Sequence, residues 1–452
     1  MPVDVESRLV DLRGRLVREY EERTKGSRSL YERARRVLPG GVTYQIRFLK
    51  PYPPYIERAE GTRVWDVDGN VYVDYWMGHG THLLGHAPSF LLSRVFELAS
   101  NGTHLGYENP LAVEYAEMLA RVVPNVDLLR FANSGTEANM YAARLVRAYT
   151  GRNYIVKIEG GWHGGYDSLH VGVHPPFEEP ESLGLPQDFT RYTITVPYND
   201  VNALEDAFKR YNPAALFIEP VLGAGGCIGP EPGYLREVRR LTYEYDVLLV
   251  FDEVITGFRL ALGGGQEYFN VDADLVVLGK AVAGGFPGAG AFGGRADVME
   301  YLDHVKRPDP RRRSFHGGTF SGNTVSIAAG YTFISYLKEN RWLYDKANNA
   351  WLTARRTLDE ICGEHDGICW TTGEGTMTGI HFTRSRPRNV REAHELRWSR
   401  LMEEVANLYM RLNGILYISD HQVHLLPALT YSNEEIKKFT ESFENLLNLV
   451  KG

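Results

Sequence analysis

The feature that most constrains the fold is an alternation of short apolar runs and helical stretches between about residues 114 and 330. Runs of four or five mainly apolar residues are typical of strands that are buried on both faces. Strands that alternate with helices predict a mainly parallel sheet covered by helices on both sides. The predicted strands are Leu128–Ala132, Tyr154–Ile158, Ala214–Ile218, Leu248–Phe251 and Leu275–Leu278.

The regions on either side have other patterns. Residues 5–37 place Leu, Val and Tyr at helical spacing among many charged residues, and this pattern stops at Pro39. Residues 63–75 alternate around an Asp-Gly pair, which predicts a β-hairpin. The chain after about residue 331 predicts a smaller α+β region whose last helix covers residues 433–450.

With 452 residues, the chain is longer than one hydrophobic core usually supports. We therefore predict an α/β protein in three parts. Residues 1–85 form an N-terminal helix and a segment of a small domain, residues 86–330 form a large domain, and residues 331–452 form a C-terminal small domain.

Charge and hydropathy exclude several classes of protein. The 50 basic and 57 acidic residues give a net charge of −7, which offers no general attraction for nucleic acid or anionic lipid. No apolar stretch approaches the length of a membrane span, and the amino terminus is charged and unlike a signal peptide. We expect a cytoplasmic protein.

The three cysteines, Cys227, Cys362 and Cys369, lack the spacing of a disulfide scaffold, so we expect a reduced chain. His365 lies between the last two, but no second pair of ligands completes a metal site. We predict no bound metal.

Two strand ends carry side chains suited to covalent chemistry. Lys280 follows the last apolar run and precedes a glycine-rich turn. Because an ammonium group resists desolvation, this lysine either reaches solvent or has a lowered pKa and serves as a nucleophile. Asp252 follows the run before it. A lysine that forms an imine and an acid that pairs with a pyridinium are the two groups a pyridoxal 5′-phosphate (PLP) enzyme needs.

A phosphate site is predicted after the strand Leu128–Ala132. Ser134 and Glu137 have capping-box spacing, Gly135 permits close approach of the backbone, and Thr136 adds a hydroxyl. The free N–H groups of the following helix would bind a phosphate. By itself, this pattern is more typical of an ordinary helix cap, and the match with the other strand ends favours a phosphate site.

Two more strand ends are candidates. Trp162 and His163 lie in a glycine-rich loop after the second strand, where the indole could stack on a flat cofactor or be an ordinary core side chain. Glu219 follows the third strand, where it needs a partner. A structural salt bridge is the alternative for Glu219 and for Asp252.

Residues 288–293 fit the pattern GxGxxG of dinucleotide-binding proteins. The match follows a Gly-Pro loop instead of a strand, and no acidic residue lies where a ribose partner is required. We therefore exclude a Rossmann dehydrogenase.

Taken in order, these motifs resemble class III (fold-type I) PLP-dependent aminotransferases, in particular the subgroup of glutamate-1-semialdehyde aminomutases and β-amino-acid transaminases. The resemblance extends from about Pro39 to the carboxyl terminus. The motifs are Ser-Gly-Thr-Glu-Ala (134–138), Gly-Gly-Trp-His-Gly (160–164), Glu-Pro-Val (219–221), Phe-Asp-Glu-Val-Ile-Thr-Gly-Phe-Arg (251–259), Leu-Gly-Lys (278–280) and Gly-Thr-Phe-Ser-Gly-Asn (318–323).

The resemblance implies a seven-stranded large domain and a role for each matching residue. Lys280 would form the Schiff base with PLP, Asp252 would pair with the pyridine nitrogen, and Trp162 would stack on the ring. The remaining cofactor-binding residues would be Ser134, Gly135 and Thr136 at the phosphate, together with His163, Glu219 and Val254.

The resemblance also implies a homodimer and a substrate pocket. Thr319 would reach the phosphate of the neighbouring subunit's cofactor. Arg47 lies where the aminomutase binds its substrate carboxylate, to which a guanidinium is well suited. Tyr44 and Trp76 would form an apolar wall of the pocket, although a surface arginine and core aromatics are the alternatives.

Departures from the aminomutase pattern favour transfer between two substrates. Ile255 is shared with the aminomutases, but the loop 219–227 lacks their asparagine. The segment 421–429 lacks the glutamate that holds the substrate amine and has His424 where other class III enzymes have arginine. We predict an aminotransferase acting between an amino acid or amine, β-amino acids included, and a keto acid. A glutamate-1-semialdehyde aminomutase, an amino-acid racemase and a non-catalytic regulator are the alternatives.

Overall fold

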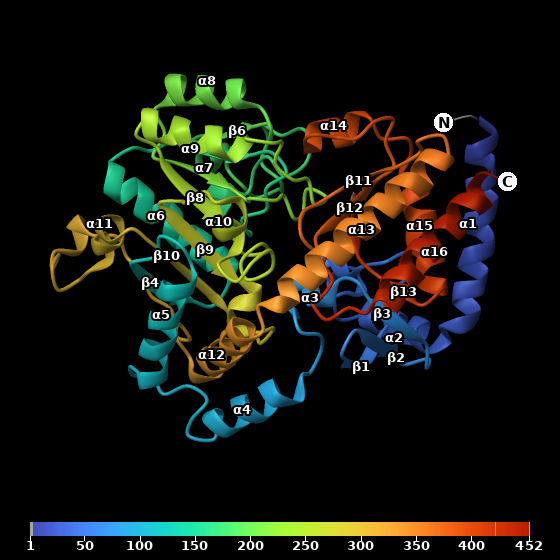
Figure 1. The fold of residues 1–452 in the computed structure, drawn as a ribbon, viewed down its shortest axis with the longest axis horizontal. Helices are drawn as coiled ribbons and strands as arrows, with labels where there is room; N and C mark the ends of the chain where they lie inside the picture. The colour runs from blue at the N-terminus through green and yellow to red at the C-terminus, as the bar shows by residue number, and fades with distance from the viewer. Residues whose placement is uncertain (1–2, 421, 452) are drawn as a thin grey trace.

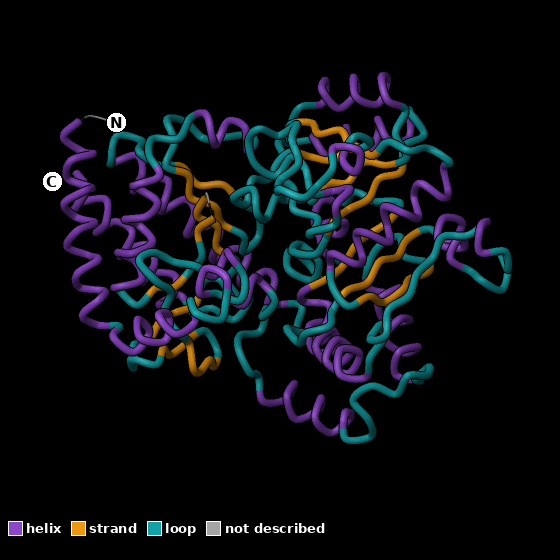
Figure 2. The backbone as a smooth tube through the Cα atoms, turned by 180° about the vertical axis from the view of Figure 1, so that it is seen from behind, coloured by secondary structure: helices purple, strands orange, loops and turns teal. Residues whose placement is uncertain are grey.

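The computed structural model describes residues 3–420 and 422–451. Figure 1 shows two halves, and the amino- and carboxyl-terminal helices lie together in one of them. The other half is built around a central sheet, which is visible from behind in Figure 2.

The central sheet has seven strands in the order β4-β10-β9-β8-β7-β5-β6. Only β10 among these strands runs antiparallel to its neighbours, which confirms the prediction of a mainly parallel sheet. The strands are β4 (Leu128–Ala132), β5 (Ile155–Ile158), β6 (Thr193–Val196), β7 (Ala215–Ile218), β8 (Leu248–Asp252), β9 (Leu275–Gly279) and β10 (Gly290–Gly294).

Alternate residues of the strands enter two different cores, which explains their continuous apolar sequences. On β7, Leu216 and Ile218 face a core shared with helices α8 and α9, whereas Ala215 and Phe217 face one shared with α6. The sheet is therefore buried on both faces. The helices of this half are α4 (Ser89–Ala99), α5 (Pro110–Val122), α6 (Gly135–Thr150), α7 (Gln187–Thr190), α8 (Val201–Tyr211), α9 (Tyr234–Glu244), α10 (Gly264–Phe269), α11 (Ala296–Met299) and α12 (Thr324–Glu339).

The smaller half combines both ends of the chain. Its first sheet has the order β1-β2-β3-β13, so that the predicted hairpin, β2 with β3, pairs with a strand from the C-terminal region. The second sheet has the order β11-β12-β15-β14. The strands are β1 (Ile56–Glu60), β2 (Arg63–Asp66), β3 (Val71–Asp74), β11 (Trp370–Thr372), β12 (Thr378–His381), β13 (Ile415–Leu416), β14 (Ser419–Asp420) and β15 (Gln422–Leu425).

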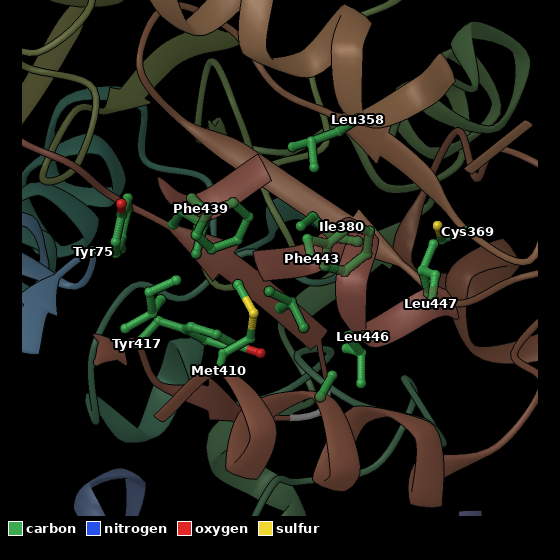
Figure 3. Packing of buried hydrophobic residues seen from close by; sticks show 14 of the residues in the cluster. Tyr75, Leu358, Cys369, Ile380, Met410, Tyr417, Phe439, Phe443, Leu446 and Leu447 are labelled. Atoms are coloured by element: carbon green, nitrogen blue, oxygen red, sulfur yellow. The ribbon is translucent and has the colours of Figure 1, made fainter. Parts of the chain in front are cut away.

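One apolar core joins these sheets to the helices around them. Figure 3 shows Phe439 and Phe443 of the last helix among side chains from segments far apart in the sequence, such as Tyr75 and Ile380. The helices are α1 (Val3–Arg23), α2 (Lys25–Ala34), α3 (Met77–Gly80), α13 (Trp342–Glu364), α14 (Val390–Glu395), α15 (Arg400–Leu412) and α16 (Asn433–Lys451).

The expectation of a fully reduced chain is wrong for two of the three cysteines. Cys362 near the end of α13 and Cys369 just before β11 form a disulfide, with 5.3 Å between their Cα atoms. The chain turns back after α13, which brings the two buried side chains together. Cys227 is a buried free thiol.

The described residues lack both clusters of metal ligands and helices that could span a membrane. Residues 3–420 and 422–451 contain no group of three or more His, Cys, Asp or Glu side chains arranged to hold a metal ion. Within the same residues, no helix is long and apolar enough to cross a membrane.

Candidate active site

The candidate active site lies at one edge of the central sheet. The carboxyl ends of β4, β5, β7, β8 and β9 meet there, because these strands are mutually parallel. A cavity of about 280 Å³ opens at this edge. Predicted cofactor residues that line it are Ser134, Gly135, Thr136, Trp162, Val254 and Lys280.

The predicted phosphate site is the first turn of α6. The Ser134 hydroxyl accepts a hydrogen bond from the Glu137 N–H at 3.1 Å, as in a capping box. Glu137 itself binds the Asn133 backbone and side-chain amides at 3.0 Å, one residue before the expected partner. A Cβ at Gly135 would lie 2.7 Å from Val254, so only glycine fits here. The first N–H groups of the turn, at Gly135 and Thr136, are donors of the kind that bind an anion at a helix start.

Asp252 forms hydrogen bonds with three neighbouring groups. Its Oδ2 accepts from the Asn139 amide at 2.8 Å and pairs with His163 Nδ1 at 2.7 Å, while Oδ1 accepts from the Val254 N–H at 3.0 Å. Burial lowers the pKa of His163, so the ring is neutral and its Nδ1 donates to Asp252. His163 therefore lies behind Asp252 and orients it.

Lys280 projects into the same cavity from the turn after β9, with a left-handed φ of 45°. Burial lowers the pKa of its ammonium group, against the opposing effect of the negative charges on Asp252 and Glu219. A lowered pKa increases the fraction of neutral, nucleophilic amine.

Glu219 links two loops of the site. Its carboxylate accepts hydrogen bonds from the Trp162 N–H at 2.8 Å and from the Gly223 N–H at 2.9 Å. Burial, together with the charge of Asp252, raises the pKa of this carboxyl group. Glu219 therefore fixes the backbone of Trp162.

Two residues that support the site were missed from the sequence. Asn139 holds Asp252, as described above. Lys157 is completely buried in β5, where its ammonium donates to the carbonyls of Gly161, Leu169 and Val171 at 2.9, 3.2 and 2.6 Å. Burial lowers its pKa to about 8. Two features of the sequence could have indicated these residues: a lysine inside an apolar strand and an asparagine among alanines near the start of α6.

The predicted substrate residues gather around His79, which the sequence did not single out. The His79 ring stacks on Tyr44 at a centroid distance of 5.8 Å and lies edge-on to Trp76 at 4.9 Å. Trp76 is buried and also contacts His424 at 4.6 Å. Burial, with the nearby positive charges of Lys280, Arg47 and His424, lowers the pKa of His79 to about 4. The exposed Arg47 donates to the Thr43 hydroxyl at 2.9 Å.

Thr319 does not reach the cavity that contains Lys280 of the same chain. It lines a second cavity of about 690 Å³, bounded by the loops 104–109 and 316–324. Exposed aromatic residues lie in these loops, with Tyr107 90% and Phe320 56% accessible. Residue His421, part of the predicted substrate segment 421–429, lies outside the described residues.

The donor set at the sheet edge fits PLP. A glycine-lined helix start suits a phosphate, the carboxylate of Asp252 suits a protonated ring nitrogen, and Lys280 supplies the amine. The fold and the site together define a fold-type I transferase of the PLP-dependent class.

Comparison with known proteins gives the family. The model of the family "Aminotransferase class-III" matches residues 48–447, and the chain belongs to this family. Its cofactor is pyridoxal 5′-phosphate, and the predictions of fold, enzyme class and cofactor are confirmed.

Three similar proteins illustrate the range of activities within the family. A glutamate-1-semialdehyde 2,1-aminomutase of Methanosarcina acetivorans is 42% identical over 430 residues, which cover 93% of this chain and 98% of the relative. The crystal structure of an omega-transaminase from Sphaerobacter thermophilus has a TM-score of 0.85 and 31% identity, covering 94% of this chain and 98% of that one. A glutamate-1-semialdehyde aminomutase from Pseudomonas aeruginosa has a TM-score of 0.87 and 26% identity, covering 98% and 99%.

Proposed function

We propose that the protein is a glutamate-1-semialdehyde 2,1-aminomutase, which moves an amino group between adjacent carbons of one substrate. The observation that carries this proposal is the 42% identity to the Methanosarcina acetivorans aminomutase along nearly all of both chains, compared with 31% for the omega-transaminase. The comparisons thus favour the alternative that the sequence motifs placed second.

The two activities share one set of cofactor residues, so the site supports both. When bound, PLP supplies an electrophilic carbon that carries the amino group and a ring that takes up electron density. Asp252 keeps the ring nitrogen protonated, and the first turn of α6 binds the phosphate. Lys280 Nζ serves first as the nucleophile and then as the base and acid that moves a proton at the amine-bearing carbon.

The substrate-binding proposal rests on the cluster around His79. Arg47 binds the substrate carboxylate in a bidentate manner. His79 is neutral near pH 7 because of its lowered pKa, and it can therefore donate or accept a hydrogen bond without adding charge. Trp76 and Tyr44 enclose this position from two sides.

A homodimer and a cytoplasmic location complete the proposal. The exposed loop that carries Thr319 supports a site completed by a second copy of the chain, because Thr319 lines a different cavity from the one that contains its own Lys280.

The decisive experiment supplies glutamate 1-semialdehyde to the PLP-loaded enzyme without any keto acid. An aminomutase makes many molecules of 5-aminolevulinate per chain under these conditions, since each turnover takes up and releases one amino group and needs no second substrate. A transaminase stops after one half-reaction. Consumption of only one equivalent of glutamate 1-semialdehyde without formation of 5-aminolevulinate, and further consumption on addition of a keto acid, would favour the transaminase.

The matched control is Lys280→Ala. We expect this variant to keep the fold and lose 10²- to 10⁴-fold in rate, roughly the range for loss of general acid–base catalysis. It should also lose the violet-region absorbance of the bound cofactor. A colourless native protein in the presence of PLP would contradict the assignment of the site.

A further inference from the structure

Helix α14 (Val390–Glu395) belongs to the C-terminal part of the chain but packs against the large half. Figure 1 shows it between the two halves, beside the loops that leave the central sheet. The Asn389 side chain caps the helix through the Glu392 N–H at 2.8 Å. The preceding carbonyl of Arg388 accepts from the Asn199 amide at 2.7 Å, which ties the segment to the end of β6.

Val390 touches the backbones of two active-site loops at once. A Cβ at Gly160 would lie 2.2 Å from Val390 Cγ2, and one at Gly225 would lie 2.8 Å from the same atom. Gly160 belongs to the loop that carries Trp162, and Gly225 belongs to the loop that follows Glu219. Val390 is 2% exposed and is therefore buried between the two loops.

Arg391 binds the first of these loops through charge. Its guanidinium donates to both carboxylate oxygens of Glu159, at 3.0 and 2.7 Å, and to Glu178 at 3.0 Å. It also lies over the Phe177 ring, 4.8 Å from the centroid. Glu159 is 2% exposed and directly follows β5, at the start of the loop. A carboxylate buried to this extent requires a cation, and α14 supplies it.

The same loop is fixed from inside by Lys157, whose ammonium binds the carbonyls of Gly161 and two later residues. The loop therefore has one anchor that belongs to the sheet and one that belongs to the C-terminal part of the chain. Glu219 then joins the two loops through the Trp162 and Gly223 amides. A displacement of α14 would therefore move both loops, the one that carries Trp162 and the one that follows Glu219.

We propose that Val390 and Arg391 are positioning residues of the cofactor site, through which the C-terminal part of the chain sets the position of the Trp162 ring and of the loop 223–227. PLP affinity consequently depends on the docking of α14. The inference rests on the family's cofactor and is independent of which substrate the enzyme takes.

The test compares Arg391→Met, Arg391→Lys and Val390→Ala with the native full chain. Each apo protein is titrated with PLP, and the dissociation constant, the absorbance spectrum of the bound cofactor and the melting temperature are measured. We expect the PLP dissociation constant to rise about ten-fold in Arg391→Met, with an altered spectrum. Arg391→Lys should recover only part of the loss, because an ammonium cannot pair in a bidentate manner.

Arg388→Met is the matched control. Arg388 lies directly before the same helix, but its guanidinium pairs with Glu392 within the segment, so native PLP affinity is expected. If Arg391→Met fails to fold, Glu159→Gln removes the same charge pair from the other side and should weaken PLP binding as well.

Two results would overturn the inference. One is a lower melting temperature with unchanged PLP affinity and spectrum, which would make α14 a purely structural element. The other is an equal loss of affinity in the Arg388→Met control.

Discussion

Buried polar side chains at the site are stabilised by hydrogen bonds to neighbouring protein groups. Asp252 receives three hydrogen bonds, Glu219 receives two, and Lys157 donates three. Each bond offsets part of the desolvation cost of a charged group. The same burial leaves several histidines neutral, and one of them provides a test.

His82 should make the stability of the protein dependent on pH. Burial and the neighbouring His86, 4.5 Å away between ring centroids, lower the pKa of His82 to about 4. An unfolded histidine titrates near 6.5, so between these values the unfolded state binds more protons. The free energy of unfolding contributed by His82 is therefore present above about pH 6.5 and is lost as the pH falls toward 4.

The measurement is denaturant unfolding of native protein and His82→Gln across this range. The variant should lose a slope of about 1.4 kcal/mol per pH unit, the value for one proton. Leu183→Gln, at a fully exposed position without a titratable group, is the control and should retain the native slope. Identical slopes for the native protein and His82→Gln would show that folding does not lower the pKa of His82.

Among the secondary-structure elements, the predicted strands of the central sheet agree with their apolar sequence pattern. The GxGxxG motif has a structural role that its pattern does not indicate. The GxGxxG match at residues 288–293 forms most of β10, an antiparallel strand between β4 and β9. Its glycines permit close contact, since a Cβ at Gly290 would lie 2.4 Å from the Ser134 carbonyl. The motif thus shapes the phosphate site from a strand, and its exclusion as a dinucleotide fingerprint agrees with the structure.

The disulfide between α13 and β11 should stabilise the smaller half. It closes a short loop, with a sequence separation of 7, and cross-links of this kind contribute about 2 to 3 kcal/mol through the unfolded chain. We expect a reductant, or the pair Cys362→Ser and Cys369→Ser, to lower the free energy of unfolding by this amount. Chemical denaturation measures the change.

A control separates the disulfide from other effects of the reductant. The double variant should be insensitive to reductant, because Cys227 is a free thiol in the native protein. Equal stability of the native protein with and without reductant would show that the bond contributes nothing.

The whole molecule joins segments that are distant in the sequence. Strand β3 from the N-terminal region pairs with β13 from the C-terminal region, and α1 packs against α15 and α16. The cofactor site lies in the large half, yet α14 reaches it from the C-terminal part. The predicted domain boundaries at 85 and 330 therefore separate segments that pack against each other in the structure.

The assembly is predicted to be a dimer through the surface around Thr319. Light scattering should give twice the chain mass of 51.1 kDa. Phe320→Glu places a charge on an exposed aromatic side chain of this surface, and it should shift the protein toward monomers and weaken PLP binding. Leu183→Glu, which is fully exposed and does not line this cavity, is the control. A monomeric native protein that binds PLP normally would contradict this prediction.

The sequence alone predicted the class of fold, five strands of the central sheet and the side chains at their ends. These follow from local patterns, because a strand buried on both faces must be apolar and a parallel sheet places strand ends at one edge. Lys280, Asp252 and Ser134 were found in this way. Strands β6 and β10 were missed, since Thr-Ile-Thr-Val of β6 is short and half polar and Gly-Ala-Phe-Gly-Gly of β10 is mostly glycine.

Only the tertiary structure decided which distant groups meet. The pairing of Asn139 with Asp252, the disulfide, the contact of α14 with two active-site loops and the cluster around His79 join residues from different elements. No periodicity in a chain records such pairings, because they depend on how whole elements pack. Sequence pattern determined where the chemistry lies along the chain, and packing determined what surrounds and orients it.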